Sequence, residues 1–405
     1  FIATFPKSQY ADDAVYELGN TYVGQNLNDK AIATYDKLIS NYASSSYTAK
    51  AILKQGLIYY NSNKETQAIL KFKKVVAEFP NSPESLEAVA TARLIYVDNG
   101  KVNEYADWVK TLSFIEVSNA DLDNDTYESA EKQYLQNNAK QAISGFTNYV
   151  SRFPNGLHAL KANFYLAQLY FADNLENNAI KPYEFVISSS RNEFTEQALA
   201  RLCQIQLKAK NYDAALLVLK RLEEEAEFPQ NTTYAQSNLM KAYYEKEEYV
   251  NAVVYADKVL KNDKIEDRIK SDAQIIVARS AMKSNDEAKA KDAYERLNKI
   301  AKGELKAEAL YYDAYFKNKE GKYEASNKVV EQIAVDYSGY KYYGSKALIV
   351  MAKNYFMLGD SFQATEILQS VVDNFASFED VLSEAQAELT RIKSEEAKRN
   401  ESITN

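Results

Sequence analysis

The sequence predicts an all-α protein in which pairs of amphipathic helices repeat along the chain. Glycine (11) and proline (6) are scarce among 405 residues, and Ala, Leu, Glu, Lys and Gln, which favour helices, are abundant. Apolar residues recur at helical spacing, and a small residue returns at steps of 35–39 residues. Such a pair has an apolar face that only a neighbour of the same kind can cover. We therefore expect a right-handed α-solenoid of about ten helix pairs with a C-terminal capping helix.

The stretch 49–83 shows the repeating unit most clearly. Two amphipathic helices are separated by the turn-forming sequence Asn61–Lys64, whose short polar side chains can bond their own backbone. Phe79-Pro80 then ends the second helix, because proline lacks an amide donor and disfavours the helical conformation of the residue before it. The apolar positions of the two helices are Leu53, Gly56, Leu57 and Tyr60, then Ala68, Phe72, Val75 and Phe79.

A small residue in the first helix marks each unit, and five of the nine steps between units are 37 residues long. An alanine follows it after twelve residues in most units, and a large residue four positions later. In the ninth unit we assign these three positions to Asp313, Ala325 and Val329. The first-helix positions are Gly19, Gly56, Arg93, Ala130, Ala167, Cys203, Met240, Ala278, Asp313 and Ala352.

The pattern also predicts where the array begins, bends and ends. Residues 1–8 read as the end of a truncated preceding repeat, because Phe5-Pro6 repeats the closure at Phe79-Pro80; we expect a piece of a longer array. Residues 9–376 form the superhelix, with irregular packing expected near 93–124 and 305–345. Residues 377–398 form the capping helix, and 399–405 a frayed tail.

The landmarks of the unit resemble those of the tetratricopeptide repeat. Gly56, Tyr59, Ala68, Phe72 and Pro80 occupy its small, aromatic, alanine, aromatic and proline positions. The resemblance implies a scaffold that binds protein segments in a concave groove lined by the first helices. The repeat length and the closures resemble bacterial cell-envelope proteins of the outer-membrane assembly lipoprotein and Tol–Pal coordinator types. That implies a periplasmic or outer-membrane-associated location, with the cytoplasm as the alternative.

Composition argues against several classes of function. The net charge of −8 disfavours a nucleic-acid binder, and no run is long and apolar enough to span a membrane. One cysteine (Cys203) and one histidine (His158) disfavour a zinc site or a histidine-based triad. Asp121, Asp123 and Asp125 alternate as in calcium loops, but the glycine and terminal glutamate of that motif are missing. We therefore expect no cofactor and no metal.

The candidate binding residues lie on the groove side of the first helices. By analogy with the family, they occur one residue after the small position and at helical spacing around it. Amide, cationic and aromatic groups there suit an extended peptide. The alternative is that they are the polar outer face of ordinary helices, with aromatic residues that complete the core. The candidates are Phe164, Tyr165, Gln168, Phe171, Arg201, Gln204, Lys241, Tyr244 and Arg279.

Three functions remain open from the sequence. The favoured one is a non-enzymatic scaffold for a protein or peptide partner in bacterial envelope assembly or maintenance. The second is a regulatory domain of a larger signalling protein. The third, an enzyme, is disfavoured because no phosphate loop, dinucleotide fingerprint, nucleophile elbow or kinase signature is present.

Overall fold

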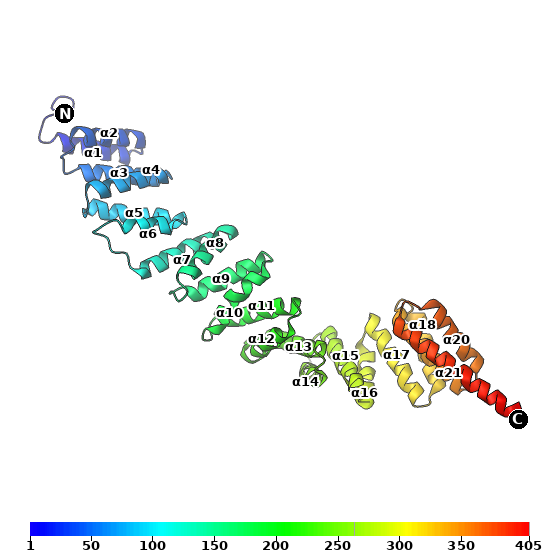
Figure 1. Ribbon diagram of the computed structural model, residues 1–405. Helices are drawn as coiled ribbons and strands as arrows, with labels where there is room; N and C mark the ends of the chain where they lie inside the picture. The colour runs from blue at the N-terminus through cyan, green and yellow to red at the C-terminus, as the bar shows by residue number, and fades with distance from the viewer. Residues whose placement is uncertain (263, 405) are drawn as a thin grey trace. The chain divides into compact units, whose positions relative to one another are not determined.

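The computed structural model describes residues 1–262 and 264–404, and in those residues it contains 21 α-helices and no strand. Helices α1–α20 form ten consecutive pairs, and α21 follows them (Figure 1). The chain divides into two compact units, Phe1–Ala198 and Leu199–Asn405. The boundary falls within α11 (Thr195–Lys208), and each unit is described separately below.

Unit 1 contains ten complete helices. Their bounds are α1 Ala11–Gly24, α2 Asn28–Asn41, α3 Thr48–Asn61, α4 Glu65–Glu78, α5 Pro83–Asp98, α6 Val102–Val109, α7 Asn119–Leu135, α8 Ala139–Arg152, α9 Ala159–Ala172 and α10 Glu176–Ser188.

Unit 2 contains the last ten helices. Their bounds are α12 Tyr212–Glu225, α13 Pro229–Glu245, α14 Tyr249–Leu260, α15 Asp267–Lys283, α16 Glu287–Ile300, α17 Gly303–Lys319, α18 Tyr323–Asp336, α19 Lys341–Met357, α20 Ser361–Asn374 and α21 Glu379–Thr404.

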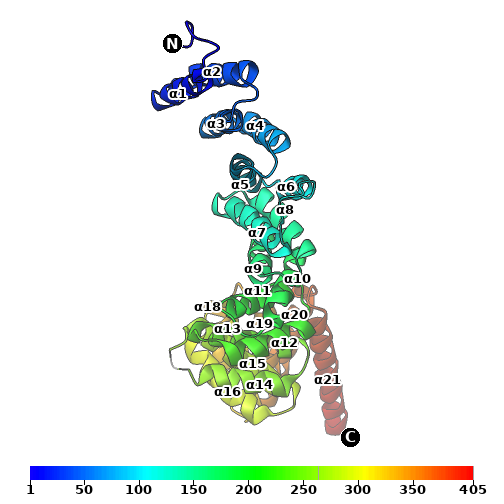
Figure 2. The ribbon, with the colours of Figure 1, turned by 90° about the vertical axis from the view of Figure 1, so that its left-hand side faces the viewer.

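Each helix packs on the next one in sequence order. This holds from α1 to α10 in unit 1 and from α12 to α21 in unit 2 (Figure 1, Figure 2). First helices of neighbouring pairs also touch, as α3 does with α5 and α13 with α15. Most contacts therefore join near neighbours in the sequence, which is the property of a repeat array. The prediction of an all-α solenoid of ten helix pairs with a final helix is confirmed.

The small residue in each first helix allows the second helix of the pair to approach closely. A Cβ atom added at Gly56 would lie 2.5 Å from Cε1 of Phe72, which is fully buried in α4. Gly19 faces Tyr35 of α2 in the same way. Both aromatic residues lie sixteen positions after the small residue, so the ring of the second helix fills the space that the small residue leaves.

The turn between the two helices of a pair has the same backbone conformation in all ten pairs. Seven residues after the small position, φ is positive, between 55° and 89°. Left-handed conformations are tolerated by Gly and Asn better than by other residues. The ten residues are Asn26, Asn63, Gly100, Asn137, Asn174, Lys210, Glu247, Asn285, Gly321 and Gly359.

The register that we assigned to the ninth pair is wrong by one residue. Ala314 is fully buried at the small position, whereas Asp313 is partly exposed and pairs with Lys317. The positions twelve and sixteen residues later are Ser326 and Val330, both buried, in place of Ala325 and Val329. The region 305–345, where we expected irregular packing, consists of regular helices α17 and α18 and the start of α19.

The third pair departs from the others, within the expected region 93–124. Its second helix, α6, has only 8 residues, whereas α2, α4 and α8 have 14. Residues 110–118 then lead to α7 without forming a helix.

At the C-terminus, α21 buries Val381, Ala385 and Ile392 against α19 and α20. The helix continues to Thr404, through most of the segment expected to fray, and Asn405 lies outside the described residues.

Candidate protein-binding surfaces

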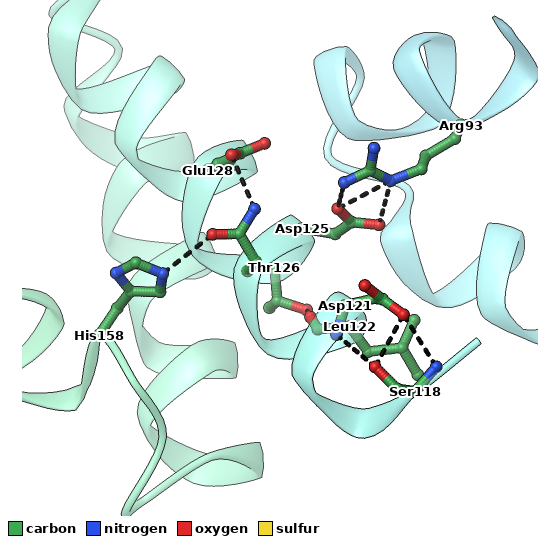
Figure 3. A network of polar contacts seen from close by, with 9 residues as sticks. Arg93, Ser118, Asp121, Leu122, Asp125, Thr126, Glu128 and His158 are labelled. Atoms are coloured by element: carbon green, nitrogen blue, oxygen red, sulfur yellow. Dashed lines mark hydrogen bonds and ion pairs between the residues drawn. The ribbon is translucent and has the colours of Figure 1, made fainter. Parts of the chain in front are cut away.

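The alternating aspartates of α7 all accept hydrogen bonds from protein groups, and Figure 3 shows those of Asp121 and Asp125. The Ser118 hydroxyl and backbone N–H donate to the Asp121 carboxylate and lower the pKa of that carboxyl. The Asp121 backbone N–H donates to the Ser118 hydroxyl oxygen in return, which completes the capping box of α7. Asp125 is completely buried and binds the guanidinium of Arg93 on α5. Among the described residues, no three His, Cys, Asp or Glu side chains gather in a metal-binding arrangement.

Arg93 explains how a large residue occupies the small position of the third pair. Its Nε donates to both oxygens of Asp125, at 2.9 and 2.8 Å, and Nη2 pairs with Oδ1. The guanidinium thus reaches out of its own pair toward α7, where the carboxylate raises the pKa of Arg93. A buried carboxylate of this kind is stable only with a charged partner, so the contact joins the third pair to the fourth.

His158 and Cys203 are also structural. His158 stacks on Tyr127, with ring centroids 4.2 Å apart, and its Nε2 lies 3.0 Å from Oδ1 of Asn124 (Figure 3). Cys203 is fully buried, and burial raises the pKa of its thiol to about 12. A thiol protonated at neutral pH and hidden from solvent is a poor nucleophile.

The four candidates on α9 belong to unit 1, and two of them are aromatic residues of its core. Phe164 is buried and stacks on Phe194, with ring centroids 4.2 Å apart. Tyr165 is half-buried and stacks on Tyr134 of α7 at 4.7 Å. These rings fill the space between neighbouring pairs. Gln168 and Phe171, later on the same helix, are both half-exposed.

The candidates on α11 and α13 are more accessible. On α11, Arg201 donates to the exposed Gln204 at 2.9 Å. On α13, Lys241 is exposed and forms an ion pair of 2.6 Å with Asp272 of α15. Tyr244, one turn later, is half-buried, and burial raises the pKa of its hydroxyl.

Arg279 on α15 forms an ion pair with a buried carboxylate. Its Nε and Nη2 donate to Glu308 of α17 at 2.9 and 2.5 Å. Only 2% of the Glu308 surface is exposed, and the hydroxyls of Tyr294 and Tyr343 also donate to this carboxylate, at 3.0 and 2.6 Å. The bidentate bond to Glu308 raises the pKa of Arg279.

The basic residues one position after the small residue follow a common rule in unit 2. Each pairs with an acidic residue about one repeat further along: Lys241 with Asp272, Arg279 with Glu308, and Lys353 with Glu384. The cationic candidates Lys241 and Arg279 therefore form ion pairs within the chain. Their evident role is to join successive first helices.

A pocket of about 660 Å³ lies between α13 and α15, next to the Lys241–Asp272 pair. Tyr234, Ile265 and Ile269 supply apolar surface, and burial raises the pKa of Tyr234 to about 12. The Ser237 hydroxyl is buried in this wall and has no hydrogen-bond partner among the described residues.

Sequence reasoning identified Lys241 but missed most of this pocket. Ser237 lies four residues before Lys241, so it occupies one of the positions that the family analogy supplies. A serine there does not by itself indicate a binding residue. Tyr234 lies six residues before Met240, outside the positions that the family analogy supplies. Ile265 belongs to the connection between α14 and α15, where no periodic pattern applies.

None of the described helices combines the length and the apolar character that crossing a membrane requires. Several solved structures resemble the chain at low identity. The TPR domain of P58(IPK) is 13% identical, over 95% of this chain and 99% of that one, with a TM-score of 0.28. Yeast Tom70 is 12% identical over 97% of each chain, with a TM-score of 0.35. Pseudomonas aeruginosa pilF is 13% identical over 56% of this chain and 97% of that one, with a TM-score of 0.26.

Two family models match parts of the chain. The tetratricopeptide repeat-like domain matches residues 114–232, and the tetratricopeptide repeat matches 13–45 and 50–82. None of the curated proteins compared with the chain matches it. The matched stretches fall on the helix pairs described above, with their small residues and left-handed turns in register. Residues 13–45, 50–82 and 114–232 thus match tetratricopeptide repeat models.

Proposed function

We propose that this chain is a non-enzymatic scaffold that binds a segment of another protein in the pocket between α13 and α15. Tetratricopeptide repeats imply a protein-interaction scaffold, which supports the general role. The observation that carries the specific site is the composition of the pocket: apolar surface beside a buried hydroxyl that lacks a partner. Such a mixture suits an anchoring side chain whose neighbouring backbone is held by hydrogen bonds.

The pocket also indicates which segment it would take. Tyr234, Ile265 and Ile269 favour an apolar or aromatic anchor. Arg268 at the rim is exposed and forms no ion pair with a described residue, so it is available to a carboxylate. Lys241 is engaged with Asp272. We therefore propose an anchor residue flanked by an acidic one, with Arg268 as the cation that meets it.

Affinity capture from the native organism with matched baits tests this proposal. Thr233→Trp places a large ring in the pocket wall, and Leu217→Trp places the same ring on α12, where Leu217 is 73% exposed and outside the pocket. We expect the unaltered bait and Leu217→Trp to retain the same partner, and Thr233→Trp to retain at least tenfold less. Circular dichroism establishes that both variants are folded. Equal capture by all three baits would contradict the assignment of the pocket.

We further propose that the scaffold acts in the bacterial envelope, in the periplasm or at the outer membrane. The support is the resemblance in repeat length and in the closures Phe5–Ser8 and Phe79–Ser82. Fractionation of native cells, with detection of the full-length protein by antibody, tests the location. Recovery with periplasmic or outer-membrane markers is expected, and recovery with cytoplasmic markers alone would contradict it.

A further inference from the structure

A second cleft, of about 550 Å³, lies in unit 1 between the α5–α6 turn and the α7/α8 pair. It occurs at the one junction of unit 1 where the second helix of the preceding pair is short. Its lining comes from the α5–α6 turn, from Val102 and Asn103 at the start of α6, and from α7 and α8.

The wall of this cleft carries hydrogen-bonding groups that the chain itself does not use. Gln141, Ser144 and Asn148 follow one face of α8, at spacings of three and four residues, and all three are exposed. Ser129 faces them from α7 and is only 6% exposed. None of these four side chains forms a hydrogen bond with another described residue, whereas most polar side chains of α7 do. All four groups lie on the cleft side of the α7/α8 pair.

The lining is nearly free of charge. Of the described residues around the cleft, only Asp98 is ionised, and it forms an ion pair of 2.6 Å with Lys132. No aromatic residue lines it, so it lacks the flat apolar surface on which a sugar ring would stack. Primary amides and hydroxyls both donate and accept hydrogen bonds, which matches the alternating N–H and C=O groups of an extended polypeptide.

Small residues, Ala130 and Gly145, form the base of the cleft. A Cβ atom at Gly145 would lie 2.8 Å from Cβ of Ala130, so α7 and α8 cross at close range. Ala130 and Gly145 both line the cleft. A bound backbone can therefore approach the helices, with Ser129 on one side and Ser144 and Asn148 on the other.

We propose that this cleft binds an extended, uncharged segment of another polypeptide by its backbone amide groups. The site is distinct in residues and chemistry from the α13/α15 pocket, which takes an apolar anchor beside an acidic group. Here Gln141 and Asn148 provide paired donors and acceptors, and Ser129 and Ser144 complete the set. Recognition is by backbone, so the segment is defined by small, neutral side chains that permit close approach.

Selection of twelve-residue peptides displayed on phage tests the proposal, with the full chain as the target. Ser144→Trp fills the cleft, and Ser151→Trp places the same ring at an exposed position of α8 outside it. We expect neutral peptides whose affinity falls at least tenfold with Ser144→Trp and with Gln141→Ala/Asn148→Ala, but less than twofold with Ser151→Trp. Thr233→Trp should leave binding unchanged, which separates this site from the α13/α15 pocket.

A second measurement tests recognition of the backbone. Methylation of one central amide nitrogen of a selected peptide should reduce affinity at least tenfold, more than replacement of the same side chain by alanine. Failure to enrich any peptide that depends on Ser144 overturns the proposal. So does an oligosaccharide on a glycan array that binds the chain and is lost with Ser144→Trp. The alanine double variant, which alters two exposed side chains only, keeps the test valid if Ser144→Trp does not fold.

Discussion

At the scale of residues, charged side chains of the first helices form ion pairs that join successive helix pairs. Lys241, Arg279 and Arg93 each reach an acidic residue of the following pair. Sequence reasoning placed Lys241 and Arg279 on the accessible side of their helices, but it could not detect their partners. Each acidic partner lies about thirty residues further along the chain. It can be recognised as a neighbour only when the register of both helix pairs is known. The ion pairs of Lys241 and Arg279 differ in burial: Glu308 is buried, whereas Asp272 is partly exposed.

That contrast leads to a prediction for stability. Arg279→Ala leaves the Glu308 carboxylate buried without a cation and should cost about 3 kcal/mol, the lower end for a broken buried pair because Arg279 is itself partly exposed. Lys241→Ala removes an exposed pair and should cost about 0–1 kcal/mol. Urea unfolding followed by circular dichroism measures both. Equal midpoints for the two variants would show that the burial of Glu308 has no energetic consequence.

At the scale of elements, a helix pair is defined by its small residue and by its turn. Both could be read from the sequence in most pairs, since Gly or Asn stands at eight of the ten left-handed turn positions. The error in the ninth pair arose because Ala325 was assigned as the second-helix alanine, which placed Asp313 at the small position; the buried residues there are Ser326 and Ala314. Gly321 was the missing signal: a turn residue seven positions after Ala314 fixes that pair correctly. The short α6 lies within 93–124, where the sequence predicted irregular packing, although its end at Val109 was not predicted.

The close approach at the small position should resist even one added methyl group. Gly56→Ala places Cβ against the Phe72 ring, which is fully buried and cannot move without disturbing its neighbours. We expect a loss of about 1–3 kcal/mol in unfolding free energy. Gly344→Ala on α19 meets nothing within 4 Å, so it should gain about 0.5–1 kcal/mol from helix propensity. Thermal melts of both variants would refute the packing argument if Gly56→Ala were as stable as Gly344→Ala.

At the left-handed turn, introducing a glycine should increase the stability of the chain. Lys210 has φ of 55° and is exposed, and a residue with Cβ pays about 1 kcal/mol or more in this conformation. Lys210→Gly should therefore raise the midpoint of thermal unfolding, by the equivalent of about 0.5–1 kcal/mol. Gly359→Ala, at the equivalent turn of the last pair with φ of 89°, should lower it. A loss of stability in Lys210→Gly would contradict the assigned role of the turn.

At the scale of the whole molecule, successive pairs are joined by aromatic side chains as well as by ion pairs. The chain has 32 tyrosines, and many of them lie between helices. Burial raises the pKa of Tyr35, Tyr127, Tyr149, Tyr294 and Tyr343 well above the ordinary value. In the folded chain these hydroxyls remain protonated at a pH at which the unfolded chain would lose its protons.

Stability should consequently fall in alkali. From about pH 10, the pKa of an unfolded tyrosine, the folded state binds more protons than the unfolded state, so the unfolding free energy decreases as the pH rises. The exposed tyrosines should ionise first, and the buried ones only when the helices are lost. Tyrosinate absorbance and helical circular dichroism, recorded in one titration, measure both. Ionisation of all tyrosines near pH 10 with the helices intact would contradict the burial described here.

The central claim is that a stack of helix pairs presents the α13/α15 pocket to a segment of another protein. The most direct test replaces Tyr234 with a photo-crosslinking phenylalanine analogue in the native organism, with Leu217 replaced in the same way as the control. We expect position 234 to form one discrete adduct, which mass spectrometry maps to an apolar residue beside an acidic one, and position 217 not to form it. No adduct at position 234, or the same adduct from both positions, would contradict the claim.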